Sequence, residues 1–355
     1  MNYIGSKLSL LEFLEKSIEV VVDENSRVFC DLFAGTGTVG THFKRKGYKV
    51  IANDIQYYSF VLNKQYIANH KPLKFERLFK RIPELENIEI AKRKDLVCDH
   101  LSNLEGVKGF IYKNYCLGGT KNQAFERQYF SDENGMKCDA IRIEIEKWKE
   151  EEEITDNEYY FLLATLLETI DKKANTASVY GAFLKKMKKT AQTPLVLKPA
   201  ELIMNDQEHE VYNDDINKVI GEVEGDILYL DPPYNQRQYA TNYHLLETIA
   251  KYDNPKIYGK TGLREYGEQK SLYCSRNQVK KAFADLISSA RQRYIFLSYN
   301  NEGLMTLDDI KEIMSSRGKY GYFTQEYSRF KADKDENREF SSNKTVEYLH
   351  YVICV

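Results

Sequence analysis

Residues 28–40 read VFCDLFAGTGTVG, and this stretch decides the fold. The apolar run from Val28 to Leu32 predicts a short buried strand, and the glycines between Gly35 and Gly40 predict a turn that enters a helix. A second apolar run, Tyr48 to Ala52, ends at Asn53-Asp54. Strand, turn, helix and strand in this order predict a β-α-β unit, and therefore an α/β fold with a parallel sheet.

The glycine pattern by itself leaves the cofactor open. Gly35, Gly37 and Gly40 match G-x-G-x-x-G, and Asp54 follows the pattern about twenty residues later, as in nicotinamide dinucleotide sites. S-adenosylmethionine has the same two requirements, because it approaches the backbone of the glycine turn closely and its ribose hydroxyls need a hydrogen-bond acceptor. Asp31 favours S-adenosylmethionine, since a carboxylate at the end of the first strand suits the cationic methionine portion. A purely structural turn is the third interpretation.

The remaining pattern divides the chain into three segments. Helical spacing of apolar residues from Lys7 to Val22 predicts an amphipathic helix. Helical periodicity also dominates residues 71–199, which predicts an inserted, mainly helical domain between a first part, 1–70, and a second part, 200–355. Further strands are expected at Glu210–Tyr212, Asp226–Leu230, Arg293–Ser298, Gly321–Tyr327 and Val346–Val355, the last two as an antiparallel hairpin that closes the sheet.

Composition narrows the class of protein. The formal net charge of −2 argues against indiscriminate coating of nucleic acid, so a DNA site requires a local basic surface. The six cysteines are scattered, which predicts neither a metal site nor a disulfide framework. No apolar run approaches the roughly 20 residues that span a bilayer, and no leader pattern precedes the first helix, so we expect a cytoplasmic protein without membrane contact.

The tetrad Asp231-Pro232-Pro233-Tyr234 carries the predicted chemistry. It follows the apolar run that ends at Leu230, and two prolines cannot continue a strand, so they hold a stiff turn where open α/β sheets bind ligands. The turn places a carboxylate, the Pro232 carbonyl and an aromatic ring together. An aromatic amine needs that set, because two acceptors that grip its hydrogens favour the pyramidal nitrogen that attacks a methyl group, while Tyr234 stacks on the base.

The order of these motifs resembles that of the alpha-group (Dam-like) DNA adenine methyltransferases of restriction-modification systems, over nearly the whole chain. The resemblance implies a Rossmann-like sheet that binds S-adenosylmethionine, an inserted target-recognition domain, and a target adenine that is flipped out of duplex DNA. It implies Asp231, Pro232 and Tyr234 as catalytic residues. It also implies cofactor contacts from Tyr3, Lys7, Asp31, Phe33, Gly35, Gly37, Asp54, Asp215 and Asp231.

Basic residues outside these motifs are candidates for DNA contact. Residues 171–200 contain seven lysines and one acid, which predicts a phosphate-binding face, although a solvated face is the alternative. His244 is expected to be structural, and Ser298–Asn301 to be either a pocket segment or an ordinary turn. The candidate DNA contacts are Lys185, Lys186, Lys188, Lys189, Arg237, Tyr239, Arg329 and Lys331.

Several alternatives stay open at this point. A methyltransferase of another planar amine, such as cytosine in DNA, adenine in RNA or a protein glutamine, is the nearest, although Asp231 favours adenine. A nicotinamide-dependent oxidoreductase depends on the glycine pattern alone, and the intact tetrad argues against a DNA-binding module without catalysis. We expect a protein that acts as a monomer on double-stranded DNA, beside a restriction endonuclease that acts separately. The DNA target sequence is not predictable.

Overall fold

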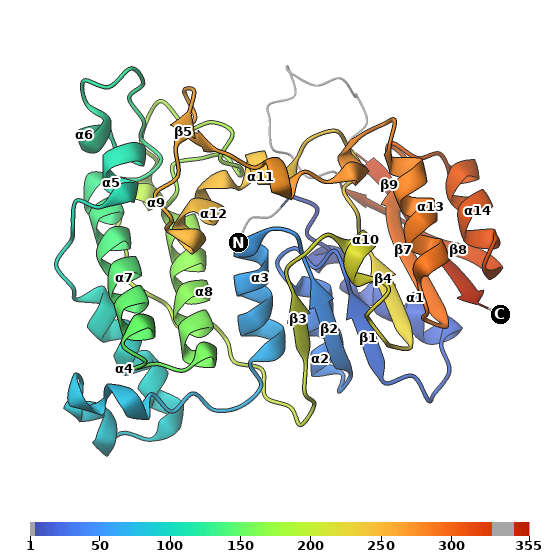
Figure 1. Ribbon diagram of the computed structural model, residues 1–355, viewed down its shortest axis with the longest axis horizontal. Coiled ribbons are helices and arrows are strands. Elements are labelled where there is room, and N and C mark those ends of the chain that lie inside the picture. Colours follow the sequence, from blue (N-terminus) through green and yellow to red (C-terminus); the bar gives the residue numbers. More distant parts are fainter. Residues whose placement is uncertain (1–3, 329–343, 355) are drawn as a thin grey trace. The chain divides into compact units, whose positions relative to one another are not determined.

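The computed structural model describes residues 4–328 and 344–354. The chain forms two compact units (Figure 1). The sheet unit comprises residues 4–63, 205–238 and 267–354, and the helical unit comprises Lys64–Met204 and Tyr239–Tyr266. Each unit is described by itself below.

The sheet unit is built on one mixed sheet (Figure 1). In the described residues the sheet has seven strands in the order β3-β2-β1-β4-β7-β9-β8. All pairs from β3 to β7 are parallel, whereas β9 is antiparallel to both β7 and β8. The mainly parallel sheet and the closing antiparallel hairpin confirm the predicted α/β class. The strands are β1 (Val28–Asp31), β2 (Lys49–Asn53), β3 (Glu210–Tyr212), β4 (Ile227–Leu230), β7 (Tyr294–Asn300), β8 (Gly318–Ser328) and β9 (Lys344–Cys354).

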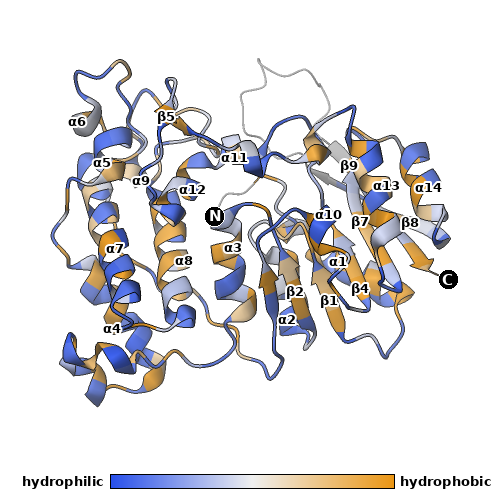
Figure 2. Ribbon diagram, in the orientation of Figure 1, coloured by the Kyte–Doolittle hydropathy of each residue, from blue (hydrophilic) through white to orange (hydrophobic). Residues whose placement is uncertain are grey.

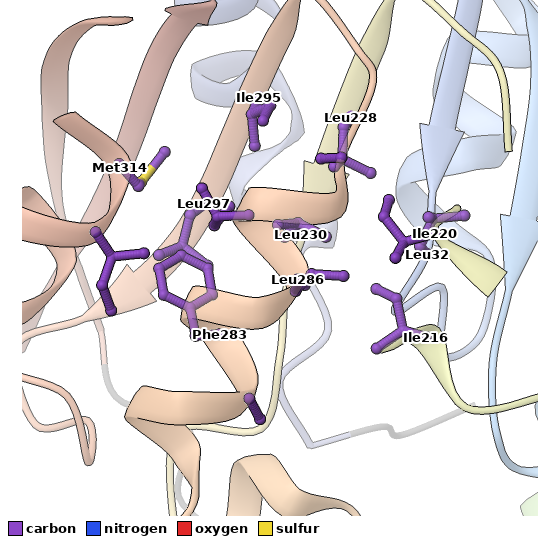
Figure 3. Packing of buried hydrophobic residues seen from close by; sticks show 14 of the residues in the cluster. Leu32, Ile216, Ile220, Leu228, Leu230, Phe283, Leu286, Ile295, Leu297 and Met314 are labelled. Atoms are coloured by element: carbon purple, nitrogen blue, oxygen red, sulfur yellow. The ribbon is translucent and has the colours of Figure 1, made fainter. Parts of the chain in front are cut away.

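Helices cover both faces of this sheet, which explains why its central strands are mainly apolar and do not alternate with polar residues. All four residues of β4 are buried, and Figure 2 shows β1 and β4 as mainly hydrophobic. Leu228 and Leu230 pack with Phe283 of α13 on one face (Figure 3). The opposite face packs against α1 and α2. The helices of this unit are α1 (Leu11–Val21), α2 (Thr38–Arg45), α3 (Tyr57–Asn63), α10 (Ile216–Val219), α13 (Val279–Ser289) and α14 (Leu307–Ser315), with 3-10 turns at Leu8–Leu10, Gly267–Gln269 and Leu272–Cys274.

Two long helices, α7 (Asp132–Glu150) and α8 (Asp156–Lys173), form the core of the helical unit. Both begin at a hydroxyl cap: Ser131 accepts a hydrogen bond from the Asn134 amide, and Thr155 forms a capping box with Glu158. The other elements are a π-helix (Lys64–Ala68), 3-10 helices (Glu76–Lys80, Pro83–Asn87), α4 (Ile90–Ser102), α5 (Phe110–Tyr115), α6 (Leu117–Thr120), α9 (Lys189–Gln192), α11 (Tyr239–Asn242), α12 (His244–Lys251) and the two-stranded ribbon β5 (Ile257–Tyr258) and β6 (Leu263–Arg264).

The segment Tyr239–Tyr266 belongs to the helical unit, which differs from the expected continuous segment 200–355. Buried polar groups hold it there. The guanidinium of Arg142, 2% exposed, donates to the carbonyls of Ile249 and Ala250. The imidazole of His244 contacts the Tyr180 carbonyl at 3.0 Å, and burial lowers the pKa of His244 to about 4, as befits a structural histidine. These contacts were not predicted, because the segment follows the tetrad directly in the sequence and Arg142 lies about a hundred positions away from it.

The described cysteines are unpaired, and all except Cys354 are buried. In the described ranges no helix is both long and apolar enough to cross a membrane.

Candidate active site

The glycine turn lies at the carboxyl end of β1, and its conformation requires glycine. Gly35 and Gly37 have φ angles of 53° and 75°, in the left-handed region that other residues rarely adopt. Three amides of the turn and of α2 already have acceptors. The Gly35 amide donates to Asp54 Oδ2 at 2.8 Å, the Gly37 amide to the Ala34 carbonyl at 2.8 Å, and the Gly40 amide to Asp31 Oδ2 at 3.0 Å.

These hydrogen bonds bear on the two cofactors that the glycine pattern left open. A dinucleotide site offers free amides of this turn to a pyrophosphate. Here the amides of Gly35 and Gly40 bind protein carboxylates instead, so a phosphate group would meet negative charge. Burial, together with the nearby carboxylates Asp231 and Asp54, raises the pKa of Asp31 to about 7, although the hydrogen bond from the Gly40 amide opposes this shift. A cation, by contrast, would stabilise the charged form of Asp31.

Asn53, at the end of β2, joins three strand ends. Its amide nitrogen donates to the carbonyls of Leu32 and Asp214, at 3.2 and 3.1 Å, and its oxygen accepts from the Asp214 amide at 3.2 Å. Sequence reasoning used Asn53 only to mark the end of a strand. A buried polar residue after an apolar strand was the available indication, because such a residue must satisfy its hydrogen bonds within the protein.

Two further predicted cofactor residues flank the turn. The half-buried ring of Phe33 packs edge-on against Tyr273, with ring centroids 4.9 Å apart. Asp215 follows β3 and caps α10, because its Oδ1 accepts a hydrogen bond from the Asn217 amide at 2.8 Å. Both residues therefore lie in loops that follow the strands β1 and β3, at the carboxyl end of the parallel sheet.

The tetrad follows β4, as predicted. Pro232 is buried, and the half-buried ring of Tyr234 contacts Tyr299 edge-on, with centroids 6.4 Å apart. The Asp231 side chain is 18% exposed. Burial raises the pKa of Asp231 to about 6, although the ammonium of Lys7 opposes this shift. Asp231 is thus ionised at neutral pH and is a strong acceptor at the edge of a largely desolvated site.

Lys7 lies beside the tetrad. Its ammonium is 3.1 Å from Asp231 Oδ1, 2.7 Å from Glu347 Oε1 and 5.9 Å from the centroid of the Tyr234 ring. Its side chain is 5% exposed, and the two carboxylates hold the pKa of Lys7 well above its ordinary value in spite of burial. Sequence reasoning missed Glu347. Its only indication was a carboxylate among the apolar and aromatic residues of strand β9.

The predicted DNA-contact residues have different surroundings. Lys185, Lys186 and Lys189 are exposed, whereas Lys188 is half-buried and donates from its ammonium to the Thr176 carbonyl at 3.1 Å. Arg237 is exposed in the turn after the tetrad, and Tyr239 stacks on Tyr243 in the helical unit. The expectations for Tyr3, Arg329 and Lys331 lie outside the described residues.

The fold and the site together define a class of protein. A mainly parallel sheet with carboxylates at the ends of several strands, and a carboxylate, a proline carbonyl and a tyrosine after β4, is an amino-methyltransferase architecture. Residues 3–313 match the family of D12 class N6 adenine-specific DNA methyltransferases, and the chain belongs to this family. It is therefore an adenine-specific DNA methyltransferase.

Relatives of the chain agree with this assignment. The chain is 53% identical to the Type II methyltransferase M.NlaIII of Neisseria lactamica, covering 99% of this chain and 98% of the relative. It is 34% identical to the Type II methyltransferase M.CviAII of Paramecium bursaria Chlorella virus 1, with 99% and 98% covered. It is 40% identical to the Type II methyltransferase M.FokI of Planomicrobium okeanokoites, of which it spans only 52%.

Proposed function

We propose that the protein transfers a methyl group from S-adenosylmethionine to the exocyclic nitrogen of an adenine that is flipped out of double-stranded DNA, as the modification enzyme of a restriction-modification system. The observation that carries the proposal is the position of Asp231: a carboxylate at the end of β4, 3.1 Å from a buried lysine, next to the carbonyl of Pro232. The names of the relatives as Type II methyltransferases support the restriction-modification role. A separate restriction endonuclease and a monomeric form on DNA remain part of the proposal.

The donor set of the carboxyl edge fits S-adenosylmethionine. Asp31 and Asp231 supply negative charge for a sulfonium and an ammonium group, and Asp54 and Asp215 supply acceptors beyond β2 and β3. Phe33 adds an apolar surface. When bound, the cofactor supplies an electrophilic methyl carbon. The amides committed to Asp54 and Asp31 argue against a dinucleotide in the same place.

The tetrad would act on the adenine amino group by position and charge. The Asp231 carboxylate and the Pro232 carbonyl accept its two hydrogens, which directs the nitrogen lone pair out of the plane of the ring. Positive charge develops on this nitrogen as the methyl group arrives, and Asp231 stabilises that charge. Tyr234 stacks on the base. At neutral pH the ionised Asp231 can also accept the proton that the methylated nitrogen releases.

The helical unit is our candidate for target recognition. Buried Arg127 donates to the carbonyls of Gly259 and Lys260 in the β5–β6 turn, and Gln128 donates to the carbonyls of Leu184 and Lys185. Arg127 and Gln128 are adjacent in sequence, so these hydrogen bonds connect both the loop with the exposed lysines and the β5–β6 turn to one segment of the helical unit. Figure 1 shows α5, α6, α9 and β5 at the same end of it. Its exposed lysines suit phosphate contacts, which orient a protein on DNA without reading the sequence.

Substitution of Asp231 tests the proposal. Asp231→Ala should reduce methyl transfer to duplex DNA by roughly 10²–10³ or more, because a preorganised electrostatic partner of the reacting nitrogen is lost. Asp231→Asn keeps one acceptor oxygen without the charge, so its rate should lie between wild type and alanine. Single-turnover transfer of a labelled methyl group measures the rate, and a DNA-binding assay should give unchanged affinity. An alanine variant that methylates adenine at the normal rate would mean that the tetrad is not the active site.

A further inference from the structure

Glu347 is a buried carboxylate that the proposed mechanism does not use. It lies on β9, opposite Asn300 of β7 and Gln325 of β8, and its side chain is fully buried. Its Oε1 accepts hydrogen bonds from the Lys7 ammonium and from the Ser298 hydroxyl. In the described part of the chain, its Oε2 has no hydrogen-bond partner.

This arrangement is costly for stability. A buried carboxylate oxygen without a partner forfeits the hydrogen bonds that water would give it, and an apolar residue on a central strand would avoid that loss. A residue that destabilises the fold in this way is expected to have a function in the active site.

The charges of the cluster indicate that role. Lys7 with Asp231 alone would form a neutral pair, and the catalytic carboxylate would face the base with its charge cancelled. Glu347 brings the formal charge of the three groups to −1. The ammonium also lies closer to Glu347, at 2.7 Å, than to Asp231, at 3.1 Å. The electrostatic attraction of the Lys7 ammonium is thereby divided between the two carboxylates, so Asp231 keeps negative charge for the adenine nitrogen.

We propose that Glu347 is a positioning residue for methyl transfer: with Ser298 it holds the Lys7 ammonium, so that Lys7 orients the Asp231 carboxylate without neutralising it. This inference rests on the proposed function of Asp231. Glu347 does not touch the base, and it acts only through Lys7 and through its charge.

The proposal predicts opposite pH shifts for two substitutions. The charged and titratable groups that face Asp231 are Lys7 from the N-terminal segment, Glu347 from β9, Asp31 from β1, and the phenols Tyr229 and Tyr234. Glu347 raises the pKa of Asp231 and Lys7 lowers it. Removing the charge of Glu347 should therefore move the acid limb of the rate to lower pH. Removing Lys7 should move the same limb to higher pH.

The experiment compares wild type, Glu347→Gln, Lys7→Met and the surface control Glu12→Gln, whose carboxylate is 82% exposed. Single-turnover methyl transfer to duplex DNA is measured from below to above pH 6, around the pKa of Asp231. We expect Glu347→Gln to lower the plateau rate by roughly 10- to 100-fold, less than loss of a direct contact, and to shift the acid limb downward. The cofactor affinity of Glu347→Gln and the pH profile of the rate of Glu12→Gln should match wild type.

The position of the acid limb does not depend on how much of a variant is folded, so it separates a positioning role from a structural one. A Glu347→Gln plateau equal to wild type overturns the inference. A lowered plateau with an unmoved or upward-shifted limb overturns it as well. If wild type itself fails to methylate adenine in duplex DNA, the proposed function falls, and this inference falls with it.

Discussion

Replacing Asp54 should weaken cofactor binding in a way that the structure makes quantitative. Its Oδ2 accepts the Gly35 amide and its Oδ1 accepts the Gln56 amide, both at 2.8 Å. These two hydrogen bonds hold the turn with or without the cofactor, so the loss of affinity comes from the ribose hydroxyls of the proposed cofactor, whose hydrogen bonds to a charged acceptor contribute about 1.5–3 kcal/mol each when buried. Asp54 is half-exposed, so water replaces part of that loss. We therefore expect Asp54→Ala to weaken S-adenosylmethionine binding by about 1–3 kcal/mol, or about 5- to 150-fold in Kd.

Isothermal titration calorimetry with S-adenosylmethionine measures this effect. Asp54→Asn should give an intermediate affinity, because its amide oxygen can still accept one backbone amide. Asp308→Ala, an exposed position in the first turn of α14, is the matched control and should bind as wild type does. Unchanged affinity in Asp54→Ala would refute both the role of Asp54 in holding the glycine turn and the placement of the cofactor beside it.

Two other predictions concern DNA affinity and pH. Neutralising the exposed lysines Lys185, Lys186 and Lys189 together should weaken binding to all DNA sequences similarly and flatten the salt dependence of the affinity. The reason is that phosphate contacts release counterions without reading bases. A binding titration at several salt concentrations checks this, and an unaltered slope would place the DNA surface elsewhere. Burial raises the pKa of Asp31 to about 7, so the native state binds a proton that the unfolded chain releases, and the stability contributed by this carboxyl is lost as pH rises from its ordinary pKa through 7. Asp31→Asn should accordingly raise Tm above wild type at pH 8, with a smaller difference at pH 5, and should weaken binding of the cationic cofactor; equal Tm differences at both pH values would contradict the assignment.

The strands were predictable because each is an apolar run bounded by turn residues. The carboxyl edge followed from the same logic, since parallel strands end together, and Asp31, Asp54 and Asp231 were expected there as strand-end residues. Asp215 depended on the family resemblance, and the roles of all four carboxylates stay predictions. The family resemblance predicted Lys7 near the methionine part of the cofactor; its position beside the tetrad was not predicted, because nothing in its local sequence indicates burial. The structure then supplied its partners.

Other features depend on contacts between distant residues, which local patterns do not encode. Glu347 is 340 positions from Lys7, and no spacing rule links them. The place of Tyr239–Tyr266 in the helical unit was not predicted for the same reason, since Arg142 binds the end of α12 through the backbone carbonyls of Ile249 and Ala250 and not through a recognisable side chain. In the sequence Lys188 cannot be distinguished from the neighbouring lysines, whereas in the structure its ammonium donates to the Thr176 carbonyl.

The position of β9 has a consequence for how the enzyme is made. In the sheet β9 lies between β7 and β8, although it follows both in the chain, so the described sheet cannot close until this strand is synthesised and inserted. Such long-range pairing is slow to form. Because β9 also carries Glu347, a nascent or shortened chain lacks the partner of Lys7. Modification of DNA by ribosome-bound or truncated copies is therefore expected to be weak, and activity should appear only after the last strand has docked.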